Sequence, residues 1–210
     1  MVFCIFLASG IFILTIDCVS CFVFRVWCLV FGVWCFMFGV WCLVFKFLIL
    51  LKMKKAIVLG STGMVGTQLI DLLLQSNDYA EVVSLVRRAS GITHPKLNEQ
   101  IVDFDKPETW SEFVKGDVLF SCMGTTIAKA KIKDNQYKID YTYQYNVAEA
   151  ASKNGVPTYV LVSSAGANEN SVTFYTHIKG QLDADVQKLP FKVITILRPG
   201  QLMATEQKTE

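Results

Sequence analysis

The chain has 210 residues and a net charge of +2, so it can form one domain with a sizeable core but has no strong field that would suggest a nucleic-acid partner. Composition changes near residue 52. Six of the seven cysteines precede that position, and only Cys122 follows it. Without a disulfide framework, the later part is typical of a reducing compartment. We therefore predict an apolar extension, residues 1–52, and a cytoplasmic globular domain, residues 53–210.

The apolar extension repeats every seven residues between positions 24 and 51, with Trp27, Trp34 and Trp41 at equivalent places. No charge occurs from residue 26 to 45, a stretch of ~20 residues that could cross a bilayer as a helix. Lysines follow it, which would orient the domain toward the cytoplasm. Two interpretations stay open. The extension is a membrane anchor, or it is a translated DNA repeat and Met53 is the true start, which we favour.

From residue 53 onward, short apolar runs alternate with longer helical patterns. The expected strands are 55–59, 82–86, 100–102, 117–122, 158–163 and 192–197. The expected helices are 64–75, 107–114, 135–153 and 173–187. The side chains expected to face the core include Val65, Leu69, Leu72, Leu73, Trp110 and Phe113. This alternation predicts a doubly wound parallel sheet (Rossmann), order 3-2-1-4-5-6, with ligands at the carboxyl ends of its strands.

A glycine-rich stretch directly follows the first expected strand and opens the first expected helix. Its residues are Gly60, Ser61, Thr62, Gly63, Met64, Val65 and Gly66. Gly60 permits a tight turn, Gly63 leaves room for a pyrophosphate, and Gly66 allows the helix to pack closely on the sheet. The helix N-terminus adds N–H groups and partial positive charge. We interpret the stretch as a dinucleotide cradle rather than a plain glycine turn.

Two arginines, Arg87 and Arg88, follow the second expected strand. An NAD site usually has an acidic residue there for the ribose 2′-hydroxyl, whereas guanidinium groups suit a 2′-phosphate. The alternative is a solvated surface pair. We predict that NADP(H) is preferred over NAD(H).

Tyr175 and Lys179 are spaced i and i+4 on the last expected helix, so both can face one site. A lysine ammonium beside a phenol lowers the tyrosine pKa, which makes Tyr175 a candidate general acid or base. Ser163 and Ser164 end the fifth expected strand and could hydrogen-bond a carbonyl oxygen. The plainer alternative is a packed tyrosine, a solvated lysine and a strand terminus. No His, Cys or Asp cluster has metal-ligand spacing.

Several stretches together make the chain resemble the atypical short-chain dehydrogenases/reductases, closest to the Tat-interacting-protein-like group. They are GSTGMVG (60–66), VRR (86–88), SCMGTT (121–126), KIDYTYQYNVAEAA (138–151), YVLVSSAGAN (159–168), FYTHIKGQLDADVQ (174–187) and ILRPGQL (196–202).

This resemblance implies hydride transfer between a nicotinamide cofactor and a small carbonyl or alcohol substrate. It implies that Ser164, or less favourably Ser163, polarises the carbonyl, that Tyr175 donates the proton and that Lys179 binds the nicotinamide ribose. Further cofactor contacts that it implies are Asp103, Phe104, Gly124, Thr125 and Pro199. Pairing of two copies through surface helices is compatible with such a fold.

The sequence departs from that family near residue 210, where members continue with segments that cover the substrate. We therefore expect a C-terminally truncated sheet domain with an open pocket. The alternative function is a non-catalytic NADP(H)-binding regulator or an inactive copy.

Overall fold

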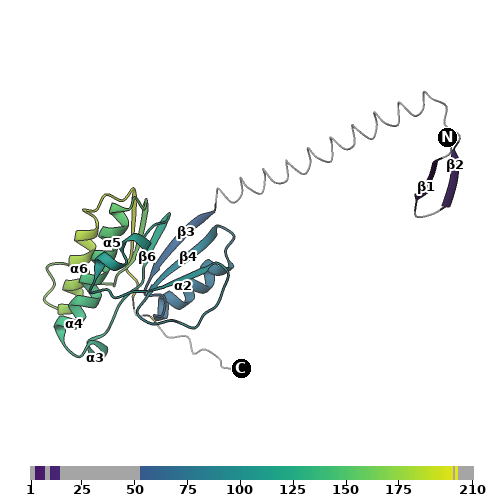
Figure 1. Cartoon of the computed structure of the whole chain (residues 1–210). Helices are drawn as coiled ribbons and strands as arrows, with labels where there is room; N and C mark the ends of the chain where they lie inside the picture. Colours follow the sequence, from purple (N-terminus) through teal and green to yellow (C-terminus); the bar gives the residue numbers. More distant parts are fainter. Residues whose placement is uncertain (1–2, 8–9, 15–52, 201, 203–210) are drawn as a thin grey trace. The chain divides into compact units, whose positions relative to one another are not determined.

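The computed structural model describes residues 3–7, 10–14, 53–200 and 202. The chain divides into two units, Met1–Lys52 and Met53–Glu210, which are treated separately below. In the first unit, strands β1 (Phe3–Leu7) and β2 (Gly10–Leu14) pair in antiparallel fashion (Figure 1). The segment 26–45, proposed above as a membrane anchor, lies outside the described residues. Within the described part, no helix has the length and apolarity that a bilayer crossing requires.

The second unit is built on one six-stranded parallel sheet. Its strands are β3 (Lys54–Leu59), β4 (Tyr79–Val86), β5 (Leu97–Ile101), β6 (Val118–Ser121), β7 (Thr158–Val162) and β8 (Val193–Leu197). The spatial order is β5-β4-β3-β6-β7-β8, and every pairing is parallel. Numbered along the domain, this is the order 3-2-1-4-5-6, so the predicted doubly wound fold is confirmed.

Helices connect the strands (Figure 1). They are α2 (Met64–Gln75), the 3₁₀ turns η1 (Pro107–Thr109) and η2 (Ser111–Phe113), α3 (Ile127–Ala130), α4 (Lys133–Tyr137), α5 (Tyr143–Lys153) and α6 (Phe174–Val186). Between α4 and α5 the chain continues as a π-helical turn, η3 (Lys138–Thr142). A π-turn is wider than an α-turn, and such turns are frequent at functional sites.

Helices cover both faces of the sheet, which explains the near-continuous apolar runs of its central strands. On one face α2 buries Ile70 and Leu73 against alternate residues of β3 and β4. On the other face α5 and α6 pack with Trp110 over the opposite residues of the same strands. Alternation of β-strand side chains therefore sends Ala56 and Val58 to one core, and Ile57 and Leu59 to the other.

The structure corrects several details of the sequence interpretation. Leu72 was expected in the core but is 67% exposed, because Ile70 is the residue that continues the buried face. Phe113 was also expected inside and is 45% exposed, whereas Trp110 is fully buried as predicted. The expected helix 107–114 is two short 3₁₀ turns. Its Trp110 indole N–H donates to the Asp103 carbonyl at 2.9 Å, which fixes the ring without a longer helix.

Candidate functional site

The carboxyl ends of all six strands lie along one edge of the sheet because the strands are parallel. A cleft of about 330 Å³ opens there. Its walls come from the loops after β3, β4, β5 and β6 and from the start of the η3–α5 helix. Strands β3 and β6 are neighbours in the sheet, and the strand order reverses between them. Doubly wound sheets bind their ligands at such a point.

Gly60 and Gly66 hold the loop after β3 in a shape that other residues could not adopt. Gly60 has φ +85°, and a Cβ there would lie 2.6 Å from the Met123 nitrogen. A Cβ on Gly66 would overlap the carbonyl oxygen of Gly60. That oxygen accepts the N–H of Gly63 at 3.0 Å and closes the turn. These two glycines therefore shape the loop from inside.

Gly63 also lines the cleft, but unlike Gly60 and Gly66 its backbone does not require a glycine. It is the N-cap of α2, with φ −83° and ψ 170°, a conformation open to any residue. A Cβ there would meet the Gly60 oxygen at 3.2 Å and little else. Thr62 also lines the cleft, whereas the buried Ser61 hydroxyl accepts from Ser84 at 2.6 Å and stabilises the loop from behind. An open cradle at a helix N-terminus is suited to a phosphate group.

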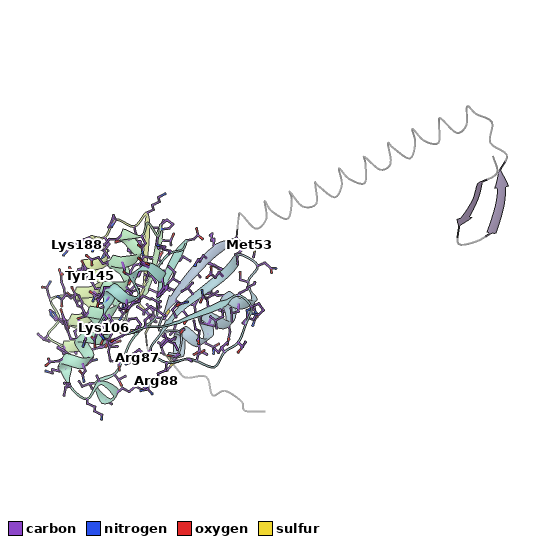
Figure 2. All side chains as sticks on the ribbon, in the orientation of Figure 1. Met53, Arg87, Arg88, Lys106, Tyr145 and Lys188 are labelled. Atoms are coloured by element: carbon purple, nitrogen blue, oxygen red, sulfur yellow. The ribbon has the colours of Figure 1, made fainter. Side chains whose placement is uncertain are left out.

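The rim of the cleft is positively charged. Among the described residues that line it, Arg87 and Lys129 are cationic and none is acidic. Arg87 and Arg88 directly follow β4 and are both exposed (Figure 2). Only Arg87 lines the cleft, so of the two predicted arginines it is the one placed to meet a ligand. Lys129, on α3, was not among the predicted contacts.

Aromatic rings close the far side of the cleft. Phe104 is buried, lines the cleft and packs against Tyr143 with ring centroids 5.4 Å apart. Asp103, which was predicted with Phe104 as a cofactor contact, does not line the cleft. Its carboxylate forms an exposed ion pair with the Lys106 ammonium, 3.7 Å away. The Tyr143 hydroxyl donates to Asp105 at 2.9 Å. This wall offers flat apolar area next to the cradle, which suits a base.

The predicted proton donor lies next to its predicted partner. Tyr175 is 36% exposed near the start of α6, and Ser164 is half-buried after β7. Burial raises the pKa of Tyr175, the hydrogen bond with Ser164 opposes that rise, and the negative charge of Asp140 adds to it. A raised pKa keeps the phenol of Tyr175 protonated at neutral pH. Ser163 is buried, and its hydroxyl has no partner among the described residues.

Lys179 is paired with Asp140. Its ammonium is buried and lies 3.3 Å from the Asp140 carboxylate, with 3% and 0% of the two side chains exposed. Burial raises the pKa of Tyr175 in this arrangement, and the lowering of that pKa by Lys179 stays a prediction. Burial raises the pKa of Asp140 as well, opposed by Lys179 and by the Thr125 N–H that donates to it at 3.0 Å.

Not every predicted residue reaches the cleft. Gly124 and Thr125 line it, whereas Met64 and Val65 lie on the first turn of α2 outside it. The Pro199 carbonyl accepts the N–H of Ala165 at 2.8 Å and so joins the loops after β7 and β8.

The cleft-lining residues that sequence reasoning missed are Leu85, Val86, Cys122, Met123, Lys129, Ile139 and Tyr143. Asp140 was missed too. The sequence feature that could have pointed to it is an acidic residue between apolar residues in an expected helix, in the stretch KIDY (138–141).

Known proteins resemble this chain over the same region. The sequence pattern of a family described as NAD(P)H-binding matches residues 60–210. The Scheffersomyces stipitis protein FMP52-1, mitochondrial, is 39% identical over 160 residues, which cover 74% of this chain and 70% of that protein. Protein FMP52, mitochondrial, of Debaryomyces hansenii is 40% identical over 159 residues, with coverage of 74% and 70%.

Solved structures share the fold at low sequence identity. The Bordetella bronchiseptica enzyme WbmG in complex with NAD superimposes with a TM-score of 0.59 at 17% identity, over 70% of this chain and 53% of that one. The UDP-glucose 4-epimerase of Thermotoga maritima, with UDP-glucose, gives 0.57 at 16% identity, over 69% and 54%. The chain thus spans about half the length of these enzymes. Together with the cradle and the sheet order, the family match leads to one conclusion: this chain belongs to the NAD(P)H-binding family, in common with the yeast FMP52 proteins, and carries a Rossmann-type domain for a nicotinamide cofactor.

Proposed function

We propose that the protein is an NADP(H)-dependent oxidoreductase of the short-chain dehydrogenase/reductase type, akin to the Tat-interacting-protein-like group, acting on a small carbonyl or alcohol. The observation that carries this proposal is the combination of a glycine cradle with a cationic rim. Gly63 leaves the cradle open, Arg87 and Lys129 line the cleft, and no acidic residue does so within the described residues. A 2′-phosphate and a pyrophosphate are the anionic groups that such a rim favours.

The residues fit a dinucleotide along the length of the cleft. In this proposal, Phe104 and Tyr143 would lie against the adenine, Thr62 and Gly63 would bind the pyrophosphate, and Gly124 would lie along the rest of the cofactor. The bound cofactor would supply or accept the hydride. The residues of the chain would bind and orient the substrate and transfer the proton.

In that reaction, Ser164 would hydrogen-bond the carbonyl oxygen and Tyr175 would deliver the proton to it. Ser164 is close enough to Tyr175 to influence its pKa, and the raised pKa of Tyr175 keeps its proton available at neutral pH. Lys179, under the floor of the cleft, would present its charge to the nicotinamide ribose. General-acid help of this kind contributes typically about 10²–10⁴-fold.

A second candidate is a protein that binds NADP(H) without turning over a substrate. It is favoured by one observation: the Lys179 charge is taken up by Asp140, and the pKa of Tyr175 is raised rather than lowered. Tyrosine activation would then be weak, while cofactor binding through the cradle would be unaffected.

The experiment that separates the two uses the full chain and a panel of aldehydes and quinones with NADPH. Oxidation of NADPH by the wild type, lost in Tyr175→Phe while NADPH binding is kept, supports the oxidoreductase. Binding of NADPH without oxidation in either protein supports the binding protein. Tighter binding of NADH than of NADPH would contradict the preference for NADP(H) in both proposals.

The location of the protein is also open to proposal. The related FMP52 proteins are named as mitochondrial, and we propose that this chain shares that location in place of the cytoplasm expected from its composition. Fractionation of cells, with detection of the full chain in the mitochondrial or the cytosolic fraction, tests it.

A further inference from the structure

Among the described residues, the most deeply buried ion pair joins η3 to α6. The Lys179 Nζ lies 3.3 Å from Asp140 Oδ1, and both side chains are almost completely withdrawn from water. Desolvating two charges is costly, so a pair of this kind is weak evidence for stability by itself. The position of this ion pair suggests a role other than stabilising the fold.

The pair lies directly beneath the cofactor cleft. Gly124 lines the cleft, and a Cβ on Gly124 would lie 3.5 Å from Asp140 Oδ1 and 3.9 Å from Lys179 Nζ. Gly124 therefore adjoins both the cleft and the two buried charges. The adjacent Thr125 N–H donates to the same Oδ1 at 3.0 Å, which ties the cleft floor to the pair.

We propose that Asp140 is a positioning residue: its carboxylate holds the Lys179 ammonium under Gly124, where that charge meets the cofactor, and locks the loop after β6 to it. The inference rests on the proposed function, because it concerns the same cofactor site. It adds a residue and a role to that site. The π-turn η3 carries Asp140, and its wide turn interrupts the α-helical spacing between α4 and α5.

Asp140 has few other partners to share its charge. Its Oδ2 is buried without a hydrogen-bond partner among the described residues. Gln136 on α4 and Thr125 are the polar groups that approach the carboxylate, and Tyr175 on α6 lies within range of its charge. Lys179 is therefore its principal counter-charge. Removing the carboxylate would leave a buried ammonium with no fixed position.

A second buried acid, Asp183 on α6, provides a control. Asp183 is equally withdrawn from water and pairs with the Arg198 Nε at 2.9 Å, and its Oδ1 likewise has no partner within the described part of the chain. It does not line the cofactor cleft. Asp183→Asn therefore removes a buried, paired carboxylate from α6, the helix that carries Lys179, without changing the lining of the cleft. A purely structural role predicts equal behaviour of the two variants.

The test is a fluorescence titration of NADPH with the full-length wild type, Asp140→Asn and Asp183→Asn, with thermal melts of each. Asparagine keeps the oxygen that accepts from Thr125 but removes the charge. We expect Asp140→Asn to raise the Kd for NADPH at least about tenfold, which is the effect of losing one charge-assisted contact. Asp183→Asn is expected to keep the wild-type Kd within about twofold, even if both variants melt earlier.

An unchanged Kd in folded Asp140→Asn, or an equal loss in both variants, would overturn the inference and leave the proposed function standing. Failure of the wild type to bind NADPH would overturn the proposed function, and this inference with it. If Asp140→Asn does not fold, the double variant Asp140→Asn/Lys179→Met removes both buried charges at once. It is expected to fold and still to bind NADPH weakly, whereas wild-type affinity in this variant would refute the role of Asp140.

Discussion

Gly63 and Gly66 stand three residues apart in the cradle, and the structure predicts that alanine affects them in opposite ways. Gly66→Ala is expected to damage the fold, because the new methyl overlaps the Gly60 carbonyl oxygen and approaches the Ser61 Cα to 2.8 Å. Gly63→Ala is expected to leave the fold nearly intact and to damage cofactor binding. Its methyl would lie 3.2 Å from the Gly60 oxygen and 3.9 Å from the Cys122 oxygen, at a position that lines the cleft.

The magnitudes follow from these contacts. Backbone atoms around Gly66 cannot move without breaking the Gly63–Gly60 turn, so we expect a cost of about 2–3 kcal/mol, typical of a forced overpacking. That corresponds to a melting temperature lower by about 4–12 °C for a domain of this size. Gly63 has ordinary φ and ψ values, so its replacement should cost about 1 kcal/mol or less. The Kd for NADPH should nevertheless rise at least about tenfold, since the methyl occupies phosphate space.

Thermal melts and NADPH titrations of the two variants provide the assay, with Gly155→Ala as a control. A Cβ on Gly155 meets nothing within 4 Å, although its φ of +79° adds modest strain far from the cleft. The reasoning is refuted if Gly66→Ala melts like the wild type, or if Gly63→Ala binds NADPH as tightly as the wild type does.

Four further outcomes follow from single contacts. Arg87→Glu should weaken the binding of NADPH about 10–100-fold and that of NADH far less, because one of the two cationic groups that line the cleft is replaced by an anionic one; equal losses would contradict this. Carbonyl reduction should stay flat through neutral pH and fall only above the raised pKa of Tyr175, with alcohol oxidation rising toward it; a basic limb in kcat/KM near pH 7 would contradict it. Burial raises the pKa of the Cys122 thiol to about 11, so peptide mapping should show slow alkylation at pH 7.5, slower still with NADPH bound. Trp110→Ala should cost about 3–5 kcal/mol in urea unfolding, and a loss under 1 kcal/mol would be inconsistent with its complete burial.

Much of the fold was predictable because strands of a parallel sheet that are covered on both faces have near-continuous apolar sequences. The expected strands 55–59 and 192–197 differ from β3 and β8 by one residue. The edge strand β5 reads Leu-Asn-Glu-Gln-Ile and was predicted three residues late, at 100–102. Strand β5 mixes polar and apolar residues, so it lacks the apolar run that marks the central strands and the other edge strand, β8. The pairing of β1 with β2 had no sequence prediction at all.

The candidate site was predictable only where the backbone dictates the residue. The glycines of the cradle follow from local geometry, so a motif finds them. The ion pair between Asp140 and Lys179 depends on how η3 and α6 pack, and no local pattern connects two residues so far apart in the chain. The choice between Arg87 and Arg88 likewise depends on which side chain lines the cleft, which the dipeptide does not encode.

Calorimetric titration of the wild-type chain with NADPH and with NADH tests the central claim most directly. The account predicts one NADPH per chain, bound at least about tenfold more tightly than NADH, with the difference abolished in Arg87→Glu. No binding of either cofactor, or a preference for NADH, would contradict it.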